Sequence, residues 1–394
     1  MVVVDALRSV GGDLDSLAST FREQPLRAVG VVVAVLVLLG AAWVVVRYLR
    51  RTPGERFVRL LGAQKAVGVL MHPGPDPDAM ACALGVASLA ERQDTDTTLY
   101  YTGQIRHHEN RAFQTVLGVT FEQIEQTGDI AEREVVLVDH NEPRGFPGAE
   151  AITPLAVVDH HPGEGTGKQF TDVRTDAGAC ATILSEYFRS IGYTPVDPHE
   201  YDSLDSTARA LPPHISTALL YGIQADTNHL TNGCSSAEFE AASYLYSGID
   251  KDKFDRIANP AMDAESLDVK ARAVLDREVR SAFAVSDVGQ VSNTDAVPQA
   301  ADELRRLEGV TAVVVLAEKD GMIHLSGRSN DDRIHMGRTL QAAVEEIPMS
   351  SAGGHARMGG GQVSTEHLEG IGSEGRIMRQ RFRERLFAAM NGEL

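Results

Sequence analysis

The segment Leu155-Ala156-Val157-Val158-Asp159-His160-His161 decides the fold. Its four apolar residues have the length and composition of a strand buried inside a sheet, and its polar residues follow at the carboxyl end. The segment 134–139 (EVVLVD) has the same form and ends in Asp139. Because parallel α/β sheets bind ligands beyond the carboxyl ends of their strands, both segments place chemical groups where a ligand would bind.

The flanking sequence predicts further strands and helices in alternation. Apolar runs over 66–71 and 97–101 are typical of strands. Apolar spacing over 80–93, 177–191, 214–222 and 236–247 is typical of helices. This order predicts an α/β fold with a parallel, Rossmann-like sheet.

A smaller α/β domain is predicted after a charged, helical connector. Strands are expected over 281–285, 310–318 and 323–327, and helices over 337–346 and 382–390. A glycine-rich stretch, 353–361 (GGHARMGGG), lies between the two helices. We therefore divide the chain into an N-terminal tail and anchor (1–55), a first domain (56–248), the connector (249–279) and a second domain (280–394).

The composition is that of a globular protein with an acidic surface. The chain of 394 residues has 37 Lys and Arg against 55 Asp and Glu, a formal charge of −18. This charge repels polyanions and makes long nucleic acid a poor partner, but it also fits a protein adapted to high salt, where screening weakens the repulsion. The three cysteines, Cys82, Cys180 and Cys234, are widely spaced, which indicates buried free thiols.

One segment differs in character from the rest. Residues 28–46 form an apolar run without a charged side chain, about the minimum length for a helix that spans the ~30 Å core of a membrane. Arg47, Arg50 and Arg51 follow it, which predicts that the C-terminal bulk lies in the cytoplasm. A cleaved signal peptide fits less well, because acidic residues precede the run and no small-residue cleavage site follows it. We expect a single-pass protein of the cell membrane with a cytoplasmic catalytic part.

Four polar motifs carry the oxygen and imidazole donors that hold divalent metal ions. They are His72-Pro73-Gly74-Pro75-Asp76-Pro77-Asp78, Val138-Asp139-His140-Asn141, Asp159-His160-His161 and Ala225-Asp226-Thr227-Asn228. Three of them follow expected strands and the fourth follows an expected helix. If they converge, they build the two-metal site of a phosphoesterase.

Each motif alone also has a structural explanation. Asp78 would suit the beginning of a helix, and Asp139 would suit a turn. In the first motif we expect the three prolines to exclude a helix, so that Asp76 and Asp78 point in the same direction from an extended loop. Two carboxylates held in this way repel each other unless a cation separates them. A further histidine pair, at 107–108, is interpreted as part of a polar surface turn.

In this order, the motifs resemble those of the DHH phosphoesterase superfamily, whose signature tripeptide is present at 159–161. The resemblance covers roughly 60–245, and the stretch Gly353-Gly354-His355 extends it to the family's DHH-associated C-terminal domain over about 260–375. Within the family, the chain is most similar to membrane-anchored cyclic dinucleotide phosphodiesterases and nano-RNases. The resemblance assigns catalysis to the first domain, substrate binding to the second, and the active site to the cleft between them.

The family implies two manganese ions, with Mg²⁺ or Co²⁺ as alternatives. The ligands it implies are His72, Asp76 and Asp139 for one ion, and Asp78, Asp139, His160 and Asp226 for the other. Besides the bridging Asp139, the catalytic groups it implies are His161 and Arg328, which stabilise charge on the phosphoryl oxygens. Arg328, Gly353, Gly354 and His355 match the groups that bind the substrate.

The predicted function is hydrolysis of a cyclic dinucleotide, cyclic di-AMP first, or of its linear product, by a hydroxide that bridges the metals. The alternatives are a nano-RNase or single-strand 5′ exonuclease, a pyrophosphatase, and a membrane-tethered nucleotide sensor without turnover. The pyrophosphatase alternative rests on the stretch 139–142 (DHNE), which resembles manganese pyrophosphatases. The sequence does not decide whether the chain forms a homodimer. The chain departs from the family pattern at Ala81, where glycine is common, and at 357–358, where small residues are usual.

Overall fold

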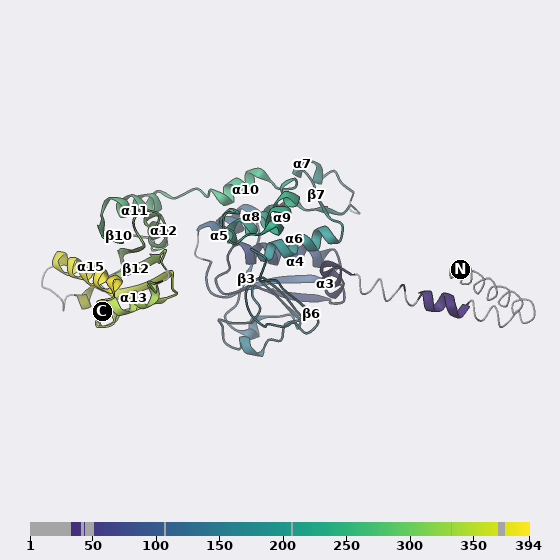
Figure 1. Cartoon of the computed structure of the whole chain (residues 1–394), viewed down its shortest axis with the longest axis horizontal. Coiled ribbons are helices and arrows are strands. Elements are labelled where there is room, and N and C mark those ends of the chain that lie inside the picture. Colours follow the sequence, from purple (N-terminus) through teal and green to yellow (C-terminus); the bar gives the residue numbers. More distant parts are fainter. Residues whose placement is uncertain are drawn as a thin grey trace, which may run out of the picture. The chain divides into compact units, whose positions relative to one another are not determined.

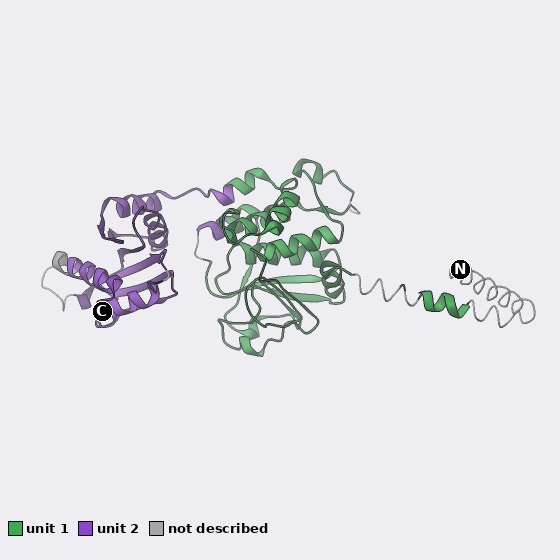
Figure 2. Ribbon diagram, in the orientation of Figure 1, with its two compact units in different colours: residues 1–105, 113–255 green, residues 106–112, 256–394 purple. Residues whose placement is uncertain are grey.

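The structure is a computed structural model that describes residues 33–40, 43, 51–105, 108–205, 208–331, 333–368 and 375–394. The chain divides into two compact units, which are coloured separately in Figure 2. The first unit contains residues up to 105 together with 113–255, and the second contains 106–112 together with 256–394. Each unit contains one six-stranded sheet.

The first unit is built on a parallel sheet of order β3-β2-β1-β4-β5-β6. Its strands are β1 (Ala66–Leu70), β2 (Asp96–Tyr101), β3 (Glu122–Gln123), β4 (Val135–Val138), β5 (Ala156–Asp159) and β6 (Phe170–Val173). Every residue of β4 and β5 is buried. This explains their uninterrupted apolar sequences. When both faces of a strand are covered, none of its side chains faces solvent, and polar residues are not needed.

Helices cover one face of this sheet (Figure 1). The helices that contact its strands are α3 (Pro53–Leu61), α4 (Pro77–Glu91) and α6 (Cys180–Ser190), while α8 (Pro213–Asp226) packs against α4 and α6, and α9 (Ser236–Tyr246) packs against α6 and α8. The central helix α4 is buried over almost its whole length and contacts α6 and α8. The remaining elements of the unit are η1 (Thr127–Asp129), η2 (Ala149–Ala151), β7 (Thr194–Pro195), α7 (Pro198–Tyr201) and β8 (Ala210–Leu211), while α5 (His108–Leu117) and α10 (Lys251–Ala258) each have residues in both units.

Helix α4 begins earlier than we predicted. Asp76 is its N-cap, and the Asp76 carboxylate accepts hydrogen bonds from the N–H groups of Asp78 and Ala79. Pro77 occupies the first helical position, where its missing N–H costs nothing because that group would have no partner within the helix. The prediction that the prolines exclude a helix is therefore wrong for Pro77, although Pro73 and Pro75 lie outside a helix as expected. Asp78 lies in the first turn of α4 instead of in an extended loop.

The second unit has a mixed sheet of order β13-β14-β12-β11-β10-β9. Its strands are β9 (Arg277–Arg280), β10 (Phe283–Gln290), β11 (Ala312–Lys319), β12 (Met322–Ser329), β13 (Ser351–Gly354) and β14 (Met358–Ser364). The pair β10–β11 is parallel and the other neighbouring pairs are antiparallel. Two separate apolar cores cover the two faces. The helices are α11 (Ala264–Leu275), α12 (Ala296–Leu304), α13 (Met336–Val344), α14 (Thr365–Leu368) and α15 (Gly375–Asn391).

The glycine-rich stretch forms the antiparallel strands β13 and β14, which we did not predict. Close approach of neighbouring atoms explains the glycines on one face of these strands. A Cβ atom at Gly361 would lie 2.7 Å from the Cβ atom of Ala352, and one at Gly359 would lie 3.1 Å from Leu340. Glycine is depleted in strands by propensity, so local sequence gives no signal for these two.

The predicted membrane helix over 28–46 requires correction. The structure describes residues 33–40 and 43 of this segment as helical, and the rest of it lies outside the described residues. Among the described residues, no helix combines the length and the apolar character that crossing a membrane requires. On this finding the predicted transmembrane helix, and the cell-membrane location inferred from it, are wrong.

Candidate metal centre

The carboxyl ends of three adjacent strands, β1, β4 and β5, bring the sequence motifs together. Each strand leads directly into one motif, helix α4 contributes its N-cap and first turn, and α8 contributes its last residue. The six residues that we predicted as metal ligands therefore lie in one place, and they are His72, Asp76, Asp78, Asp139, His160 and Asp226.

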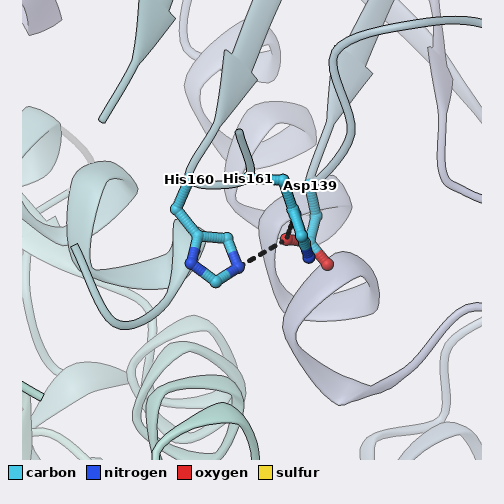
Figure 3. Close-up of side chains that lie close together, drawn as sticks. All are labelled: Asp139, His160 and His161. Carbon is cyan, nitrogen blue, oxygen red and sulfur yellow. Dashed lines mark ion pairs between the residues drawn. The ribbon is translucent and has the colours of Figure 1, made fainter. Parts of the chain in front are cut away.

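The ligand atoms form overlapping groups, and within each group they lie within 4.8 Å of one another. One group is His72, Asp76 and Asp139, and a second is Asp78, Asp139, His160 and Asp226. A third joins Asp139 and His160 to His161, and Figure 3 shows these three side chains. Asp139 belongs to all three groups, which is the position of a carboxylate that bridges two metal ions.

Two histidines direct a ring nitrogen at carboxylates of this cluster. His72 Nε2 lies 3.5 Å from Asp76 Oδ2 and 3.5 Å from Asp139 Oδ2. His160 Nε2 lies 3.3 Å from Asp139 Oδ1 and 3.2 Å from Asp226 Oδ2. The two rings thus approach Asp139 at different oxygens.

The other nitrogen of each ring faces a backbone carbonyl. His72 Nδ1 lies 3.2 Å from the carbonyl oxygen of Pro73, and His160 Nδ1 lies 3.2 Å from that of Ala177. A carbonyl at Nδ1 favours a proton on that atom and leaves Nε2 as the nitrogen that can bind a metal.

Asp139 has the properties of a ligand whose partner is a cation. Its side chain is fully buried, and its backbone has a φ of 60°, which is uncommon for a residue other than glycine. Both Asp139 carboxylate oxygens and His160 Nε2 are buried without a hydrogen bond. Since nearly all buried polar atoms in proteins have a partner, these three atoms fit divalent metal ions held between them.

Asp78 is held from behind by the N-terminus of helix α6. Its Oδ2 accepts a hydrogen bond from the N–H of Cys180 at 2.6 Å, and its Oδ1 accepts one from Ala181 at 2.9 Å. Burial raises the pKa of Asp78 well above its ordinary value, and repulsion by Asp139 and Asp226 adds to the rise. Burial also raises the pKa of Asp226 to about 6. Bound cations would relieve this crowding of carboxylates.

The two imidazoles carry protons at neutral pH. Burial disfavours the charged ring of His72, but the nearby carboxylates of Asp139 and Asp76 outweigh it and raise the pKa to about 10. At His160 burial again opposes the charge, and Asp139 and Asp226 raise the pKa to about 12. A metal ion must displace both of these protons, because only the neutral ring binds a metal.

We therefore expect metal binding to release at least two protons at pH 7, one from each ring, and the apparent affinity to rise with pH. The apparent affinity should still rise with pH above pH 6.5, the ordinary pKa of histidine. The raised pKa values of His72 and His160 keep both rings charged in that range. Titration calorimetry of Mn²⁺ binding in buffers of different ionisation enthalpy measures the number of protons. The variant His72→Asn should release about one proton fewer than the unaltered chain. Binding that releases no protons would contradict the assignment.

His161 differs from its neighbour His160 in exposure and in its partner. The His161 side chain is 47% exposed, and its Nδ1 lies 3.0 Å from Asp159 Oδ1 and 3.6 Å from Asp139 Oδ1. The hydrogen bond with Asp159 raises the pKa of His161. An accessible imidazole whose protonated form is favoured, beside the carboxylate cluster, has the properties of a proton donor.

His140 is a residue to which we assigned no role from sequence. It is buried behind the cluster, and its Nδ1 lies 2.9 Å from the carbonyl oxygen of Val138. Burial lowers the pKa of His140 to about 4. The neutral ring packs edge-on against His72, with ring centroids 6.5 Å apart, and so supports the position of that side chain. A histidine that directly follows Asp139 is the only signal that sequence offers for it.

Comparison with known proteins agrees with this geometry. Residues 66–223 match the DHH family, N-terminal domain, and residues 280–374 match the DHHA1 domain. The chain belongs to the DHH phosphoesterase superfamily.

Among the relatives of this DHH protein is an uncharacterised protein of Methanocaldococcus jannaschii, MJ1633, which is 33% identical over 288 residues and matches 73% of this chain and 55% of that protein. The cyclic-di-AMP phosphodiesterase GdpP of Geobacillus thermodenitrificans is 25% identical over 323 residues, covering 77% and 46% of the two chains. The cyclic-di-AMP phosphodiesterase PdeA of Listeria monocytogenes is 26% identical over 301 residues, covering 71% and 43%. The chain thus spans about half the length of the curated relatives it matches.

An exopolyphosphatase-related protein of Bacteroides fragilis shares the fold. The two structures superpose with a TM-score of 0.56 at 15% sequence identity, over 86% of this chain and 96% of that one. At 15% identity this likeness shows the shared fold alone.

In the DHHA1 domain, the predicted phosphate-binding residue Arg328 is already held by another side chain. Its Nε lies 2.8 Å from Asp302 Oδ1 and its Nη2 lies 3.3 Å from Asp302 Oδ2. The third nitrogen, Nη1, donates to the hydroxyl of Ser326 at 3.2 Å. The guanidinium group is therefore buried and ordered.

The glycine-rich residues of the DHHA1 domain form an open patch of sheet. Gly353 pairs with Gly360, and a Cβ atom at Gly353 would meet no atom within 4 Å. The N–H of His355 donates to the carbonyl of Met358 at 2.8 Å and closes the turn between the two strands. The His355 side chain is exposed. These residues can thus reach a ligand without rearrangement of the sheet.

The cysteines of this DHH protein are free, as we predicted. Cys82 and Cys180 are buried, with Cys82 Sγ 3.9 Å from Asp78 Oδ1, and Cys234 is partly buried. Of the second histidine pair, position 107 lies outside the described residues. His108 begins α5 and joins none of the described clusters that could hold a metal.

Proposed function

We propose that this DHH protein is a manganese-dependent phosphodiesterase that hydrolyses a cyclic dinucleotide, cyclic di-AMP first, or the linear dinucleotide made from it. The observation that carries the proposal is the place of Asp139 in two groups of potential metal ligands. The names of GdpP and PdeA support the substrate class. In this proposal residues 56–248 form the catalytic domain and residues 280–394 the substrate-binding domain.

The residues of the cluster suit two manganese ions. His72, Asp76 and Asp139 would hold one, and Asp78, Asp139, His160 and Asp226 would hold the other. Carboxylate oxygens combined with two imidazoles favour Mn²⁺ over Ca²⁺ or a thiolate-bound metal. When bound, the ions supply an activated water molecule at neutral pH and neutralise charge on the phosphoryl group.

His161 and the DHHA1 residues perform the remaining steps in this proposal. Asp159 raises the pKa of His161 and so favours its protonated form, which gives a proton to the leaving ribose oxygen. Arg328 binds a phosphate group of the substrate. Because Asp302 already orders the guanidinium group, little side-chain entropy is lost when phosphate binds. Gly353, Gly354 and His355 contact the rest of the nucleotide.

A substrate panel tests the proposal. The full chain is assayed with Mn²⁺ against cyclic di-AMP, cyclic di-GMP, linear dinucleotides, short RNA and pyrophosphate, with and without a chelator. We expect metal-dependent turnover that is fastest on cyclic di-AMP or its linear product. Turnover of pyrophosphate alone would favour the pyrophosphatase alternative, and tight nucleotide binding without turnover would favour a nucleotide sensor.

Filling the open patch at Gly353 should weaken substrate binding without unfolding the protein. The variant Gly353→Val adds a side chain whose Cβ atom would meet no atom within 4 Å, so we expect the fold to accept it. We expect KM to rise about tenfold or more, which is ~1.4 kcal/mol of binding free energy, with kcat nearly unchanged. Gly128→Val is the matched control, since Gly128 also has open surroundings but lies in η1 of the first unit. An unchanged KM for Gly353→Val would exclude a substrate contact there.

A further inference from the structure

Asn141 makes a set of hydrogen bonds that the metal cluster does not require. It follows β4, two positions after Asp139, and its side chain is buried. Its Nδ2 donates to Asp159 Oδ2 at 2.8 Å and lies 3.2 Å and 3.4 Å from the carbonyl oxygens of His161 and Pro162. Three acceptors around one amide nitrogen define which end of the amide carries the N–H groups.

Asp159 connects this amide to the imidazole of His161. One carboxylate oxygen of Asp159 accepts from Asn141, and the other lies 3.0 Å from His161 Nδ1. The carboxylate is fully buried, and it also accepts hydrogen bonds from the backbone N–H groups of His160 and His161, while Asn141 holds one of its two oxygens. Asn141 therefore fixes the carboxylate that fixes the ring, and it also contacts the main chain of His161 directly.

The loop that follows His161 closes over Asn141 and leaves the amide little freedom. A Cβ atom at Gly163 would collide with the side-chain amide of Asn141, and one at Gly165 would collide with its carbonyl group. Glycine at both positions lets the loop backbone lie directly on Asn141. The side chain is thus enclosed, and its orientation is determined by packing as well as by hydrogen bonds.

The neighbouring ring of His160 is held by a different group. Its Nδ1 faces the carbonyl oxygen of Ala177, and its Nε2 faces Asp139 and Asp226. Loss of the Asn141 amide would therefore leave the contacts of His160 in place. The two adjacent histidines depend on separate supports.

We propose that Asn141 is a positioning residue that holds His161, through Asp159, in the orientation needed to give its proton to the leaving group. The effect of Asn141 on catalysis rests on the proposed function. Its effect on the orientation of His161 rests only on the contacts described above. Supporting residues of this kind typically contribute 10- to 100-fold to activity.

A double-mutant cycle on the full chain tests the catalytic consequence. We expect Asn141→Ala to lower kcat by about 10- to 100-fold, with KM and the rise in melting temperature on adding Mn²⁺ nearly unchanged. In a His161→Ala background the same change should cost less than about twofold, because the ring that it positions is gone. A full additional loss in that background, or loss of the Mn²⁺ effect in the single variant, would overturn the proposal.

An isosteric variant separates hydrogen bonding from packing. Asn141→Asp keeps the shape of the side chain but replaces the donor that faces Asp159 with an acceptor. We expect a fall in kcat at least as large as that of Asn141→Ala. Near-normal kcat in Asn141→Asp would show that only packing matters and would end the proposal.

A spectroscopic readout tests the positioning without any turnover. In the metal-free chain with ¹⁵N-labelled histidine, the Nδ1 proton of His161 is assigned by its absence in His161→Ala. We expect this resonance to broaden or disappear in Asn141→Ala, while that of His160 remains. An unchanged His161 resonance would overturn the positioning role. If the unaltered chain turns over none of the substrates, the proposed function fails, and this measurement still decides the inference.

Discussion

Replacing Asp139 with Asn is expected to lower kcat about 10³-fold or more while the protein stays folded, a loss of ~4 kcal/mol of transition-state stabilisation. Asp139 belongs to both groups of potential metal ligands, so its loss disrupts both sites together. Asparagine has the same shape and tolerates the positive φ of 60° at this position better than alanine. The metal-free melting temperature of Asp139→Asn should therefore exceed that of Asp139→Ala.

Kinetics with Mn²⁺ and thermal melting with and without Mn²⁺ measure this effect. The unaltered chain should gain melting temperature on adding the metal, by mass action, and Asp139→Asn should gain little. Asp94→Asn is a close control, because Asp94 is exposed, has a φ of 55° and joins none of the described metal-binding groups. Near-normal turnover in Asp139→Asn would show that the activity does not depend on Asp139 as a ligand shared by two metal ions.

The adjacent histidines should separate metal binding from proton transfer. His160→Ala removes a ring that faces two carboxylates of the cluster, and we expect it to lose both turnover and the stabilisation by Mn²⁺. His161→Ala removes a half-exposed ring that is held by Asp159. We expect it to keep the stabilisation by Mn²⁺ and to lose about 10²- to 10⁴-fold in kcat, the range for a lost general acid.

The leaving group of the substrate identifies the role of His161. A phosphodiester that releases p-nitrophenolate needs no proton on its leaving oxygen, so His161→Ala should lose far less activity on it than on a dinucleotide. Asp159→Asn should resemble His161→Ala, because it weakens the hydrogen bond that raises the pKa of the ring. An equal loss on both substrates would mean that His161 does not donate the proton.

Strands in the centre of the first sheet could be predicted from sequence, and several strands at the edges of the two sheets could not. Strands β4 and β5 are buried on both faces, so their apolar runs are uninterrupted. Strand β6 has mostly partly exposed residues, and β13 contains two glycines, so neither resembles a buried strand. The connector that we predicted as helical also contains β9, which alternates between exposed and partly exposed residues.

The local sequence by itself determined which chemical groups this protein presents, and that they stand where strands or helices begin or end. Apolar runs and the residues that follow them are short-range features, and they sufficed to single out the four polar motifs, while the resemblance to the DHH phosphoesterase superfamily named the six ligand residues within them. Only the tertiary structure decided that β1, β4 and β5 are neighbours, so that His72 and Asp226 meet across Asp139. It likewise decided that Asn141 meets Asp159. Such contacts join residues far apart in the chain, and they depend on strand order and loop packing, which no local periodicity encodes.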